Sequence, residues 1–136
     1  MEQLNLKFNQ TKKAIVSLGQ VLKEMNNSKN LDSISHLIIQ DSAIKRFEYS
    51  IDTLWKYLKL FLEEKHRVVQ KSPKTVFKEL FRIGILTEQE TKIAMDLLES
   101  RNLTSHTYNE DTAEEVFEDI PKYYEFMEMI LEKTKP

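Results

Sequence analysis

Residues 44–61 read IKRFEYSIDTLWKYLKLF and carry apolar side chains at intervals of three and four residues. These side chains belong to Ile44, Phe47, Ile51, Leu54, Leu58 and Phe61. The spacing is typical of the buried face of an α-helix in a bundle. Because Asp32 or Ser33 provides a start signal and the pattern ends near Lys65, the sequence predicts one long helix here, the longest of the chain.

A second amphipathic helix is predicted on the N-terminal side of this stretch. Its stripe is apolar except at one position and consists of Leu4, Phe8, Thr11, Ile15, Leu18, Leu22 and Met25. Gly19 lies inside the pattern at a cost of about 1 kcal/mol relative to alanine, which is explained if a neighbouring element approaches closely. The polar residues 26–30 predict a loop between the two helices.

Two further helices are predicted from their start and stop signals. Ser72 and Pro73 provide an N-cap and a first helical position, and Gly84 predicts a left-handed stop after a short third helix. Residues 87–90, Thr-Glu-Gln-Glu, have the spacing of a capping box. They predict a fourth helix that continues to Arg101.

The fifth helix is predicted to follow a connection at residues 108–110, with Asp111 and Glu114 as a capping pair. Its inward side chains are Val116, Phe117, Ile120, Tyr124, Met127 and Leu131. Pro121 lies within this pattern, so we expect it to kink the helix or to begin a new segment. The short connections between the five elements predict antiparallel neighbours.

The composition favours an all-α protein. The chain has 136 residues, of which 40% are hydrophobic, and contains only two glycines and three prolines. Helix-forming residues such as leucine, lysine and glutamate are frequent, whereas the residues of a turn-rich β architecture are scarce. We therefore predict a single domain, residues 1–136, folded as an antiparallel up-and-down bundle of about five helices.

Cysteine content, hydropathy and charge exclude several classes of protein. The chain has no cysteine, which excludes disulfides and thiolate metal sites and suits a reducing cytoplasm. The N-terminus lacks the apolar run of a signal peptide, and no stretch approaches the roughly 18 apolar residues of a membrane span, so we expect a soluble cytoplasmic protein. A formal net charge of −2 argues against a general nucleic-acid-coating protein but leaves local recognition of RNA open.

Residues 101–108, Arg-Asn-Leu-Thr-Ser-His-Thr-Tyr, place a guanidinium, an imidazole and a phenol near the end of the fourth helix. Helical geometry puts Asn102 and His106 on one face, and likewise Arg101 and Ser105. A neutral imidazole can take the proton from a ribose 2′-hydroxyl while a guanidinium stabilises the growing phosphate charge. Tyr108 also offers a hydroxyl that a nucleotidyltransferase could modify.

The same motif has a purely structural explanation. Cationic side chains near a helix C-terminus interact favourably with the helix dipole and with unpaired carbonyls, without any catalysis. An arginine and a histidine five residues apart are common by chance. Spacing alone therefore favours the structural explanation.

A polar stripe runs beside the core face of the long helix. Glu48, Asp52, Trp55 and Lys59 share this stripe at 100° per residue. Two carboxylates four residues apart repel weakly unless a cation lies opposite, and Arg101 is the candidate for that cation. The alternatives are a solvated flank in which Asp52 pairs with Lys56, and a role for Trp55 in the core, in a subunit interface or in base stacking.

Two blocks of this sequence resemble the HEPN superfamily, in its branch of nucleotidyltransferase substrate-binding proteins, or HepT-like toxins. Residues 101–108 resemble its Arg-polar-(three residues)-His-x-Tyr signature, and residues 45–56 are similar to its Arg-Phe-Glu...Trp-Lys helix. Ser72-Pro73 and the following helix also match the family layout. Asp52 and Thr53 depart from it, since Glu-Leu is expected at these positions.

The resemblance implies a HEPN-like four-helix core and a metal-independent endoribonuclease toxin. Arg101 would bind and stabilise phosphate, His106 would act as base, and Asn102 would orient the imidazole or hold a phosphate oxygen. Glu48, Asp52 and Ser105 are possible supporting residues. The resemblance also implies a minimal nucleotidyltransferase (MNT) antitoxin that silences the toxin by adenylylating Tyr108, and a homodimer in which two motifs face one cleft.

A different class of function stays open beside the toxin. The chain could be the non-catalytic substrate-binding subunit of a two-component nucleotidyltransferase, with the same cleft holding a nucleotide or nucleic acid. A third interpretation leaves the motif as helix-end capping in an oligomer. The combination of Arg101, His106 and Tyr108 favours the toxin, because an adaptor does not need a titratable base beside a modifiable phenol.

No cofactor or metal is expected from the sequence. The three histidines are spread too widely for a recognisable metal motif, and no glycine-rich phosphate loop is present, so the chain is not itself expected to be a nucleotidyltransferase. One basic cluster could guide a phosphate backbone, although the acids between its members favour an ordinary solvated surface. It comprises Lys65, Arg67, Lys71, Lys74, Lys78 and Arg82.

Overall fold

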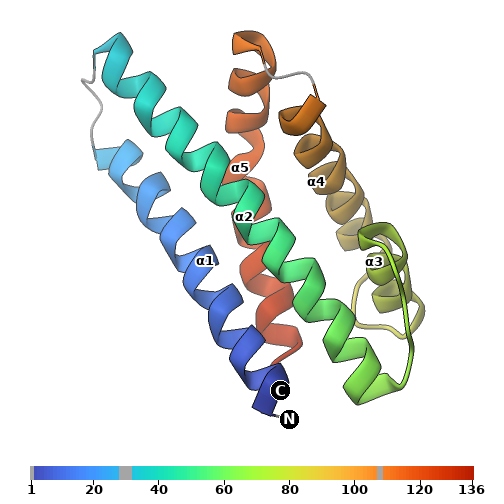
Figure 1. Ribbon diagram of the computed structural model, residues 1–136. Coiled ribbons are helices and arrows are strands. Elements are labelled where there is room, and N and C mark those ends of the chain that lie inside the picture. The colour runs from blue at the N-terminus through green and yellow to red at the C-terminus, as the bar shows by residue number, and fades with distance from the viewer. Residues whose placement is uncertain (1, 28–31, 107–108) are drawn as a thin grey trace.

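A computed structural model describes residues 2–27, 32–106 and 109–136, and helices are the only regular secondary structure in this part of the chain (Figure 1). The five helices are α1 (Glu2–Asn27), α2 (Ser33–His66), α3 (Pro73–Arg82), α4 (Glu88–His106) and α5 (Glu110–Lys133). Along the chain, α1, α2, α4 and α5 alternate in direction. The predicted all-α, up-and-down bundle is confirmed.

The long helix α2 is built as its apolar pattern predicts. All six side chains of the predicted stripe are buried, the most exposed being Phe61 at 6%. Asp32 caps the N-terminus, where its side chain accepts a hydrogen bond of 2.7 Å from the backbone N–H of Ser35. Arg67 ends the helix in the left-handed conformation, with its N–H bonded to the carbonyl of Leu62.

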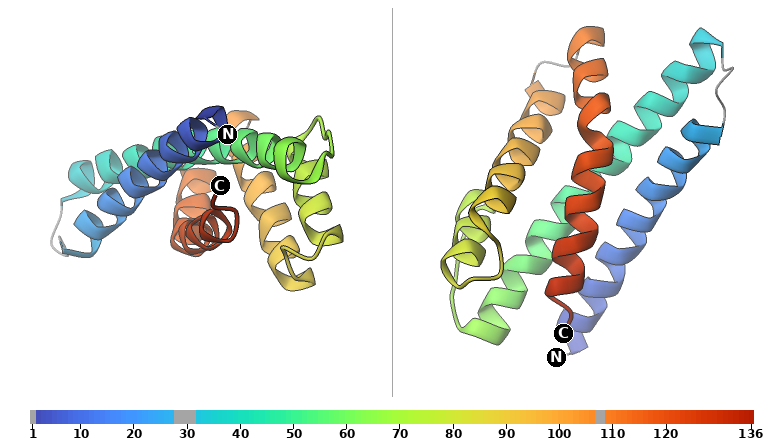
Figure 2. Two further views of the ribbon diagram at one scale, coloured as in Figure 1. Left: turned by 90° about the horizontal axis from the view of Figure 1, so that it is seen from below. Right: turned by 180° about the vertical axis from the view of Figure 1, so that it is seen from behind.

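The helices form two layers around a shared core. Figure 2 shows α1 and α2 side by side in one layer, with α5 packed across the inner side of both and α4 beside it. The short helix α3 contacts α4 and α2. Phe47 of α2 stacks on Tyr123 of α5 with ring centroids 5.6 Å apart, which joins the two layers at the centre. No helix in the described residues has the length and apolar character needed to cross a membrane.

Gly19 marks the close approach that its position in α1 suggests. A Cβ atom built on Gly19 would lie 2.5 Å from the hydroxyl oxygen of Tyr124 in α5 and within 2.9 Å of two of its ring carbons. Real Cβ atoms do not approach other atoms so closely, because the van der Waals radii overlap. Gly19 therefore allows α1 and α5 to pack at this distance.

The local signals for α3 and α4 are confirmed by their hydrogen bonds. The side chains of Ser72 and Thr75 each accept from the other's backbone N–H at the start of α3. Gly84 follows this helix with a φ of 86°, which favours glycine. At the start of α4, Glu90 N–H donates to the Thr87 hydroxyl at 3.1 Å, and Thr87 N–H donates to the Glu90 carboxylate at 2.9 Å.

Two local predictions need correction, and a third is decided in part. Asn109, not Asp111, caps α5, since its side chain accepts from the N–H of Thr112 at 2.9 Å, and Asp111 lies in the first turn, where the helix dipole favours an acid. Helix α1 extends through Asn26 to Asn27, beyond the start of the predicted loop. Of the two outcomes expected at Pro121, a new segment does not occur, because α5 continues through this residue and Ile120 and Tyr123 are buried on either side of it.

Because Gly19 contacts Tyr124, the effect of Gly19→Ala on the free energy of unfolding should change sign when the tyrosine side chain is removed. Gly19→Ala should lower the free energy of unfolding by about 1–3 kcal/mol, because the added methyl overpacks against the ring. In a Tyr124→Ala background the same substitution should raise it by up to about 1 kcal/mol, since only the helix propensity of alanine then acts. Urea unfolding of the four proteins measures both effects. Equal effects in both backgrounds would contradict the close contact.

Candidate functional site

The C-terminal half of α4 carries Arg101 to the surface of α2. Ala94, Leu97 and Leu98 of α4 are buried in the core and fix the face of this helix that points inward. One turn further, the hydroxyls of Ser100 and Tyr123 lie 3.0 Å apart and join α4 to α5. Both residues are buried, so this hydrogen bond forms away from water and anchors the end of α4.

Arg101 binds two carboxylates of α2. Its Nη1 atom lies 2.8 Å from Oε2 of Glu48, and its Nη2 atom lies 3.1 Å from Oδ2 of Asp52. The Nε atom also donates to Oδ1 of Asp52 at 3.3 Å, so Asp52 is bound through both of its oxygens. Such a two-pronged contact fixes the plane of the guanidinium as well as its position.

Thr104 completes this cluster and is the member that the sequence did not reveal. Its hydroxyl lies 3.1 Å from Oε2 of Glu48 and 2.8 Å from the backbone carbonyl of Arg101, and it can donate to either. Thr104 is 7% exposed. Its position three residues after Arg101 was the available signal, because residues i and i+3 share a helix face. We refer to Glu48, Asp52, Arg101 and Thr104 as the arginine cluster.

The electrostatics of the arginine cluster follow from these contacts. The hydrogen bond with Asp52 raises the pKa of the Arg101 guanidinium, and the charges of Asp52 and Glu48 act in the same direction against the opposing effect of burial. Arg101 is thus the cation that the two carboxylates were expected to need, and Asp52 pairs with it instead of with Lys56. The cluster contains two carboxylates and one guanidinium.

The other residues of the predicted site divide into two groups. Asn102 is exposed and takes no part in the arginine cluster. The side chains of Ser105 and His106, and the whole of Tyr108, lie outside the described residues. A site that Arg101 shares with His106 and Tyr108 therefore stays a prediction. Trp55, on the same stripe of α2, packs partly buried against the core.

Other polar residues that the sequence offered as candidates for phosphate or metal binding make structural contacts. In the predicted basic cluster, Arg82 forms an ion pair with Glu79 within α3. His36 lies in the first turn of α2 with its ring edge-on to Phe117, at 5.9 Å between centroids. Within residues 2–27, 32–106 and 109–136, as far as side chains are described, no group of three or more histidines and acids could hold a metal ion.

One known protein family matches almost the whole chain. Residues 6–136 match the family described as "Nucleotidyltransferase substrate binding protein like". The chain belongs to this family. Its members are HEPN-like, so the resemblance inferred from the two sequence blocks is confirmed. No curated protein matches the chain.

Solved structures agree with this family assignment. A protein of Thermus thermophilus is 32% identical, with a TM-score of 0.79 over 93% of this chain and 99% of the other. A tri-AMPylated HEPN toxin of Shewanella oneidensis in complex with an MNT antitoxin has a TM-score of 0.72 at 17% identity, covering 96% and 94% of the two chains. A toxin-antitoxin structure with AMP-PNP has a TM-score of 0.74 at 17% identity, covering 97% of each. At 17% identity the similarity shows a shared fold alone.

The arginine cluster should stabilise the contact between α2 and α4. Arg101→Gln should lower the free energy of unfolding by about 1–2 kcal/mol, because it leaves two carboxylates facing each other at a partly shielded site. Adding Glu48→Gln should recover part of this loss. Chemical denaturation of the single and double variants measures the coupling.

A matched control for this prediction lies at the C-terminal end of the chain. Lys135→Gln removes an ion pair with Glu132, but the two side chains are 55% and 70% exposed, so the expected loss is below about 0.5 kcal/mol. Equal losses for Lys135→Gln and Arg101→Gln would show that the arginine cluster has no special stabilising role.

Proposed function

We propose that this chain is a HEPN-type, toxin-like endoribonuclease that works with an MNT-type nucleotidyltransferase antitoxin. The observation that supports this proposal best is the arginine cluster. Arg101 belongs to one of the two blocks that resemble the family, whereas Glu48 and Asp52 belong to the other, and the fold brings these blocks into contact. The arginine of the motif is therefore held in a defined orientation and is not merely part of a helix end.

The proposed reaction is an attack within the RNA strand. His106 takes the proton of a ribose 2′-hydroxyl, whose oxygen then bonds to the adjacent phosphorus. The bond from phosphorus to the 5′-oxygen breaks, leaving a 2′,3′-cyclic phosphate on one product, and the 5′-oxygen takes a proton from water on leaving. Arg101 stabilises the negative charge that grows on the phosphate oxygens. In this proposal Asn102, which is exposed and follows Arg101 in the chain, holds a phosphate oxygen or orients the imidazole.

The number of reactive groups favours a site built from two subunits. In one copy of the arginine cluster, Glu48 and Asp52 already bind the single guanidinium. A twofold pairing that brings two motifs together leaves the ratio of charges unchanged, but it offers two Arg101 and two His106 side chains to one phosphate. We therefore propose a homodimer as the active form.

The surface of α2 supports this dimer. Ile34, Leu37 and Ile38 are 71%, 40% and 63% exposed near the N-terminus of the helix. Ile34 precedes Asp52 by 18 residues, which is about five turns, so it lies on the same face of α2 as the arginine cluster. An exposed apolar surface on the same face of this helix is typical of a subunit interface.

Regulation by the antitoxin would act through Tyr108. Transfer of an adenylyl group to its hydroxyl adds a bulky, negatively charged phosphodiester seven residues from Arg101. Such a group can occupy the place of the RNA phosphate. The Shewanella oneidensis protein is an AMPylated toxin, which makes this modification chemically reasonable for a protein of the same fold.

A second candidate function is a non-catalytic, substrate-binding subunit of a two-component nucleotidyltransferase. The balance of charge in the arginine cluster supports this alternative, because Arg101 is already neutralised by carboxylates and then has a structural role. The description of the family also fits it. Loss of cleavage on substitution of His106 separates the two candidates.

The ribonuclease proposal predicts cleavage of RNA in the presence of EDTA. His106→Ala should lower the rate about 10²- to 10⁴-fold, as expected for the loss of a general base. Arg101→Ala should lower it about 10²- to 10³-fold, as expected for the loss of a group that stabilises transition-state charge. Gel analysis of a labelled RNA incubated with each purified protein measures these rates.

Two controls make this experiment decisive. Lys92→Ala changes an exposed lysine of the same helix and should cleave like the wild type. Intact mass identifies a sample that is already adenylylated, and the added mass should be missing from Tyr108→Phe. Cleavage that survives both motif substitutions would refute the assignment, and an unmodified wild type that does not cleave would favour the binding subunit.

The dimer proposal makes a prediction about mass in solution. Ile34→Lys together with Ile38→Lys should convert a dimer into a monomer, because the interface would have to bury two charges. Val69→Lys is the matched control, since Val69 is 66% exposed in the connection between α2 and α3. Analytical ultracentrifugation measures the mass. A monomeric wild type, or a dimer that tolerates both lysines, would place the interface elsewhere.

A further inference from the structure

Charge is distributed unevenly over the bundle. Helix α5 carries nine carboxylates and two lysines, so its net charge is more negative than the net charge of −2 of the whole chain. The remainder of the chain is therefore net positive. In α1, residues 3–23 contain four lysines and no acid. The small net charge of the chain thus conceals an acidic helix and a basic one.

The basic residues of α1 border a groove with α2. This α1–α2 groove is lined by Gln10, Lys13, Ala14, Ser17, Arg46 and Tyr49 and has a volume of about 270 Å³. None of its lining residues is acidic. Figures 1 and 2 show α1 and α2 forming one layer whose outer side faces away from α5, and the groove lies between these two helices.

The cation of the groove is held in place by neutral contacts, and an exposed aromatic residue lines the groove with it. Arg46 donates from Nε to the hydroxyl of Ser17 at 3.0 Å and from Nη1 to the carbonyl and hydroxyl of Ser42. These partners orient the guanidinium across the helices without cancelling its charge. Tyr49 is 61% exposed, so one face of a large aromatic ring meets solvent beside Arg46 and Lys13.

The same surface continues along α1. A shallow depression that shares Lys13 and Ser17 with the groove adds Asn9, Lys12, Val16 and Gln20. Residues 9–20 span about three helical turns, which is longer than a single nucleotide needs. On its other side, Lys12 borders a depression in which Glu128 and Glu132 of α5 offset the charges of Lys12 and Lys135. The outer face of α1 and α2, in contrast, offers a polyanion basic residues without acidic ones.

We propose that the α1–α2 groove binds single-stranded RNA, with Lys13 and Arg46 on the phosphate backbone and Tyr49 stacked on a base. A basic groove with an exposed aromatic ring is the usual arrangement for single-stranded nucleic acid. Neutral hydrogen-bonding groups, such as Gln10, suit sugar and phosphate oxygens. The proposal rests on the proposed RNA-cleaving function and supplies the surface that holds the strand.

The position of the groove fits the arginine cluster. Arg46, Glu48 and Tyr49 belong to one turn of α2, and Glu48 binds Arg101 while the other two line the groove. A strand in the groove reaches the cluster by crossing α2. The basic residues around α3 are a weaker choice, because Arg82 is already paired with Glu79.

Binding of a short fluorescent 2′-O-methyl RNA tests this inference without cleavage, since the attacking hydroxyl is blocked. Tyr49→Ala should weaken binding about 5- to 150-fold, whereas Tyr49→Phe, which keeps the ring, should bind like the wild type. Lys12→Ala with Lys13→Ala should reduce the slope of log affinity against log salt by about 1.4, which corresponds to two lost phosphate contacts. Fluorescence anisotropy over a series of salt concentrations measures both quantities.

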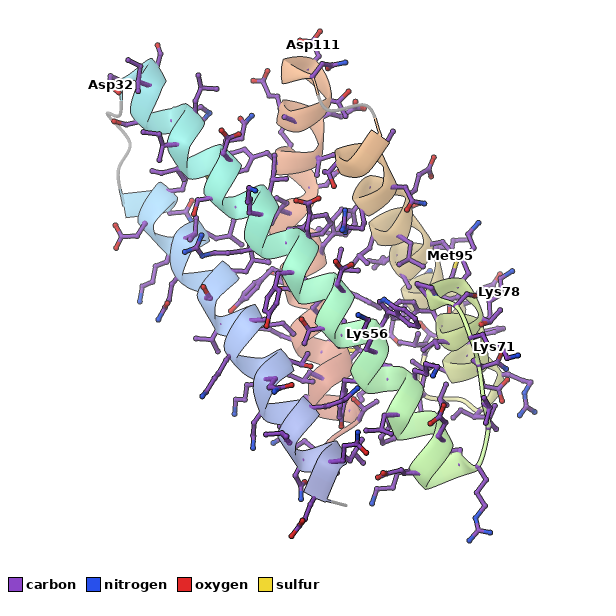
Figure 3. All side chains as sticks on the ribbon, in the orientation of Figure 1. Asp32, Lys56, Lys71, Lys78, Met95 and Asp111 are labelled. Atoms are coloured by element: carbon purple, nitrogen blue, oxygen red, sulfur yellow. The ribbon has the colours of Figure 1, made fainter. Side chains whose placement is uncertain are left out.

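The matched control is Lys71→Ala with Lys78→Ala, which removes the same charge beside α3, far from α1 (Figure 3). Equal effects of the two double variants would overturn the inference, as would unchanged binding by Tyr49→Ala or no binding by the wild type. Groove variants that bind RNA normally but lose an MNT-type partner in a binding assay would show a protein interface instead. If RNA binds specifically to the groove but unmodified RNA is not cleaved, only the ribonuclease proposal is overturned. If RNA is cleaved but binding does not depend on the groove, only the present inference is overturned.

Discussion

The structure depends on the burial of one face of α2, because each of the other four helices packs directly against this helix. Among the described residues, α1 makes no contact with α3 or α4, so their relative positions are set through α2 and α5. Burying one large apolar side chain contributes about 1.5–3 kcal/mol relative to leaving it exposed. The continuous stripe from Ile44 to Phe61 therefore stabilises the bundle and fixes the rotation of α2 about its axis.

That rotation determines the chemistry on both sides of the helix. Successive residues of a helix point about 100° apart, so Phe47 can enter the core while Glu48 binds Arg101 and Arg46 faces α1. A change in the packing of Phe47 on Tyr123 would displace the arginine cluster and the α1–α2 groove together. The arginine cluster and the α1–α2 groove thus both depend on the position of one turn of α2.

Local signals predicted the helices well where the deciding hydrogen bonds span only three residues. The capping pairs at Ser72 and Thr87 are examples, since each is complete within its own segment of sequence. The start of α5 was less predictable because Asn109 and Asp111 can both cap a helix, and only the extended backbone of Asn109, with φ −128° and ψ 171°, shows which of them does so. Pro121 does not begin a new segment for a related reason, because burial on both sides outweighs one missing hydrogen bond.

The sequence by itself determined the helical class, the order of the elements, their buried stripes and the two blocks that resemble the family. Only the tertiary structure decided that Asp52 and Glu48 pair with Arg101, from 49 and 53 residues away, and that Thr104 joins them. The local alternative, Asp52 with Lys56, has the spacing of an exposed helix pair worth a few tenths of a kcal/mol. Packing of α4 on α2 brings the planar, partly shielded guanidinium of Arg101 between two carboxylates. The spacing of these residues along the sequence does not determine this contact.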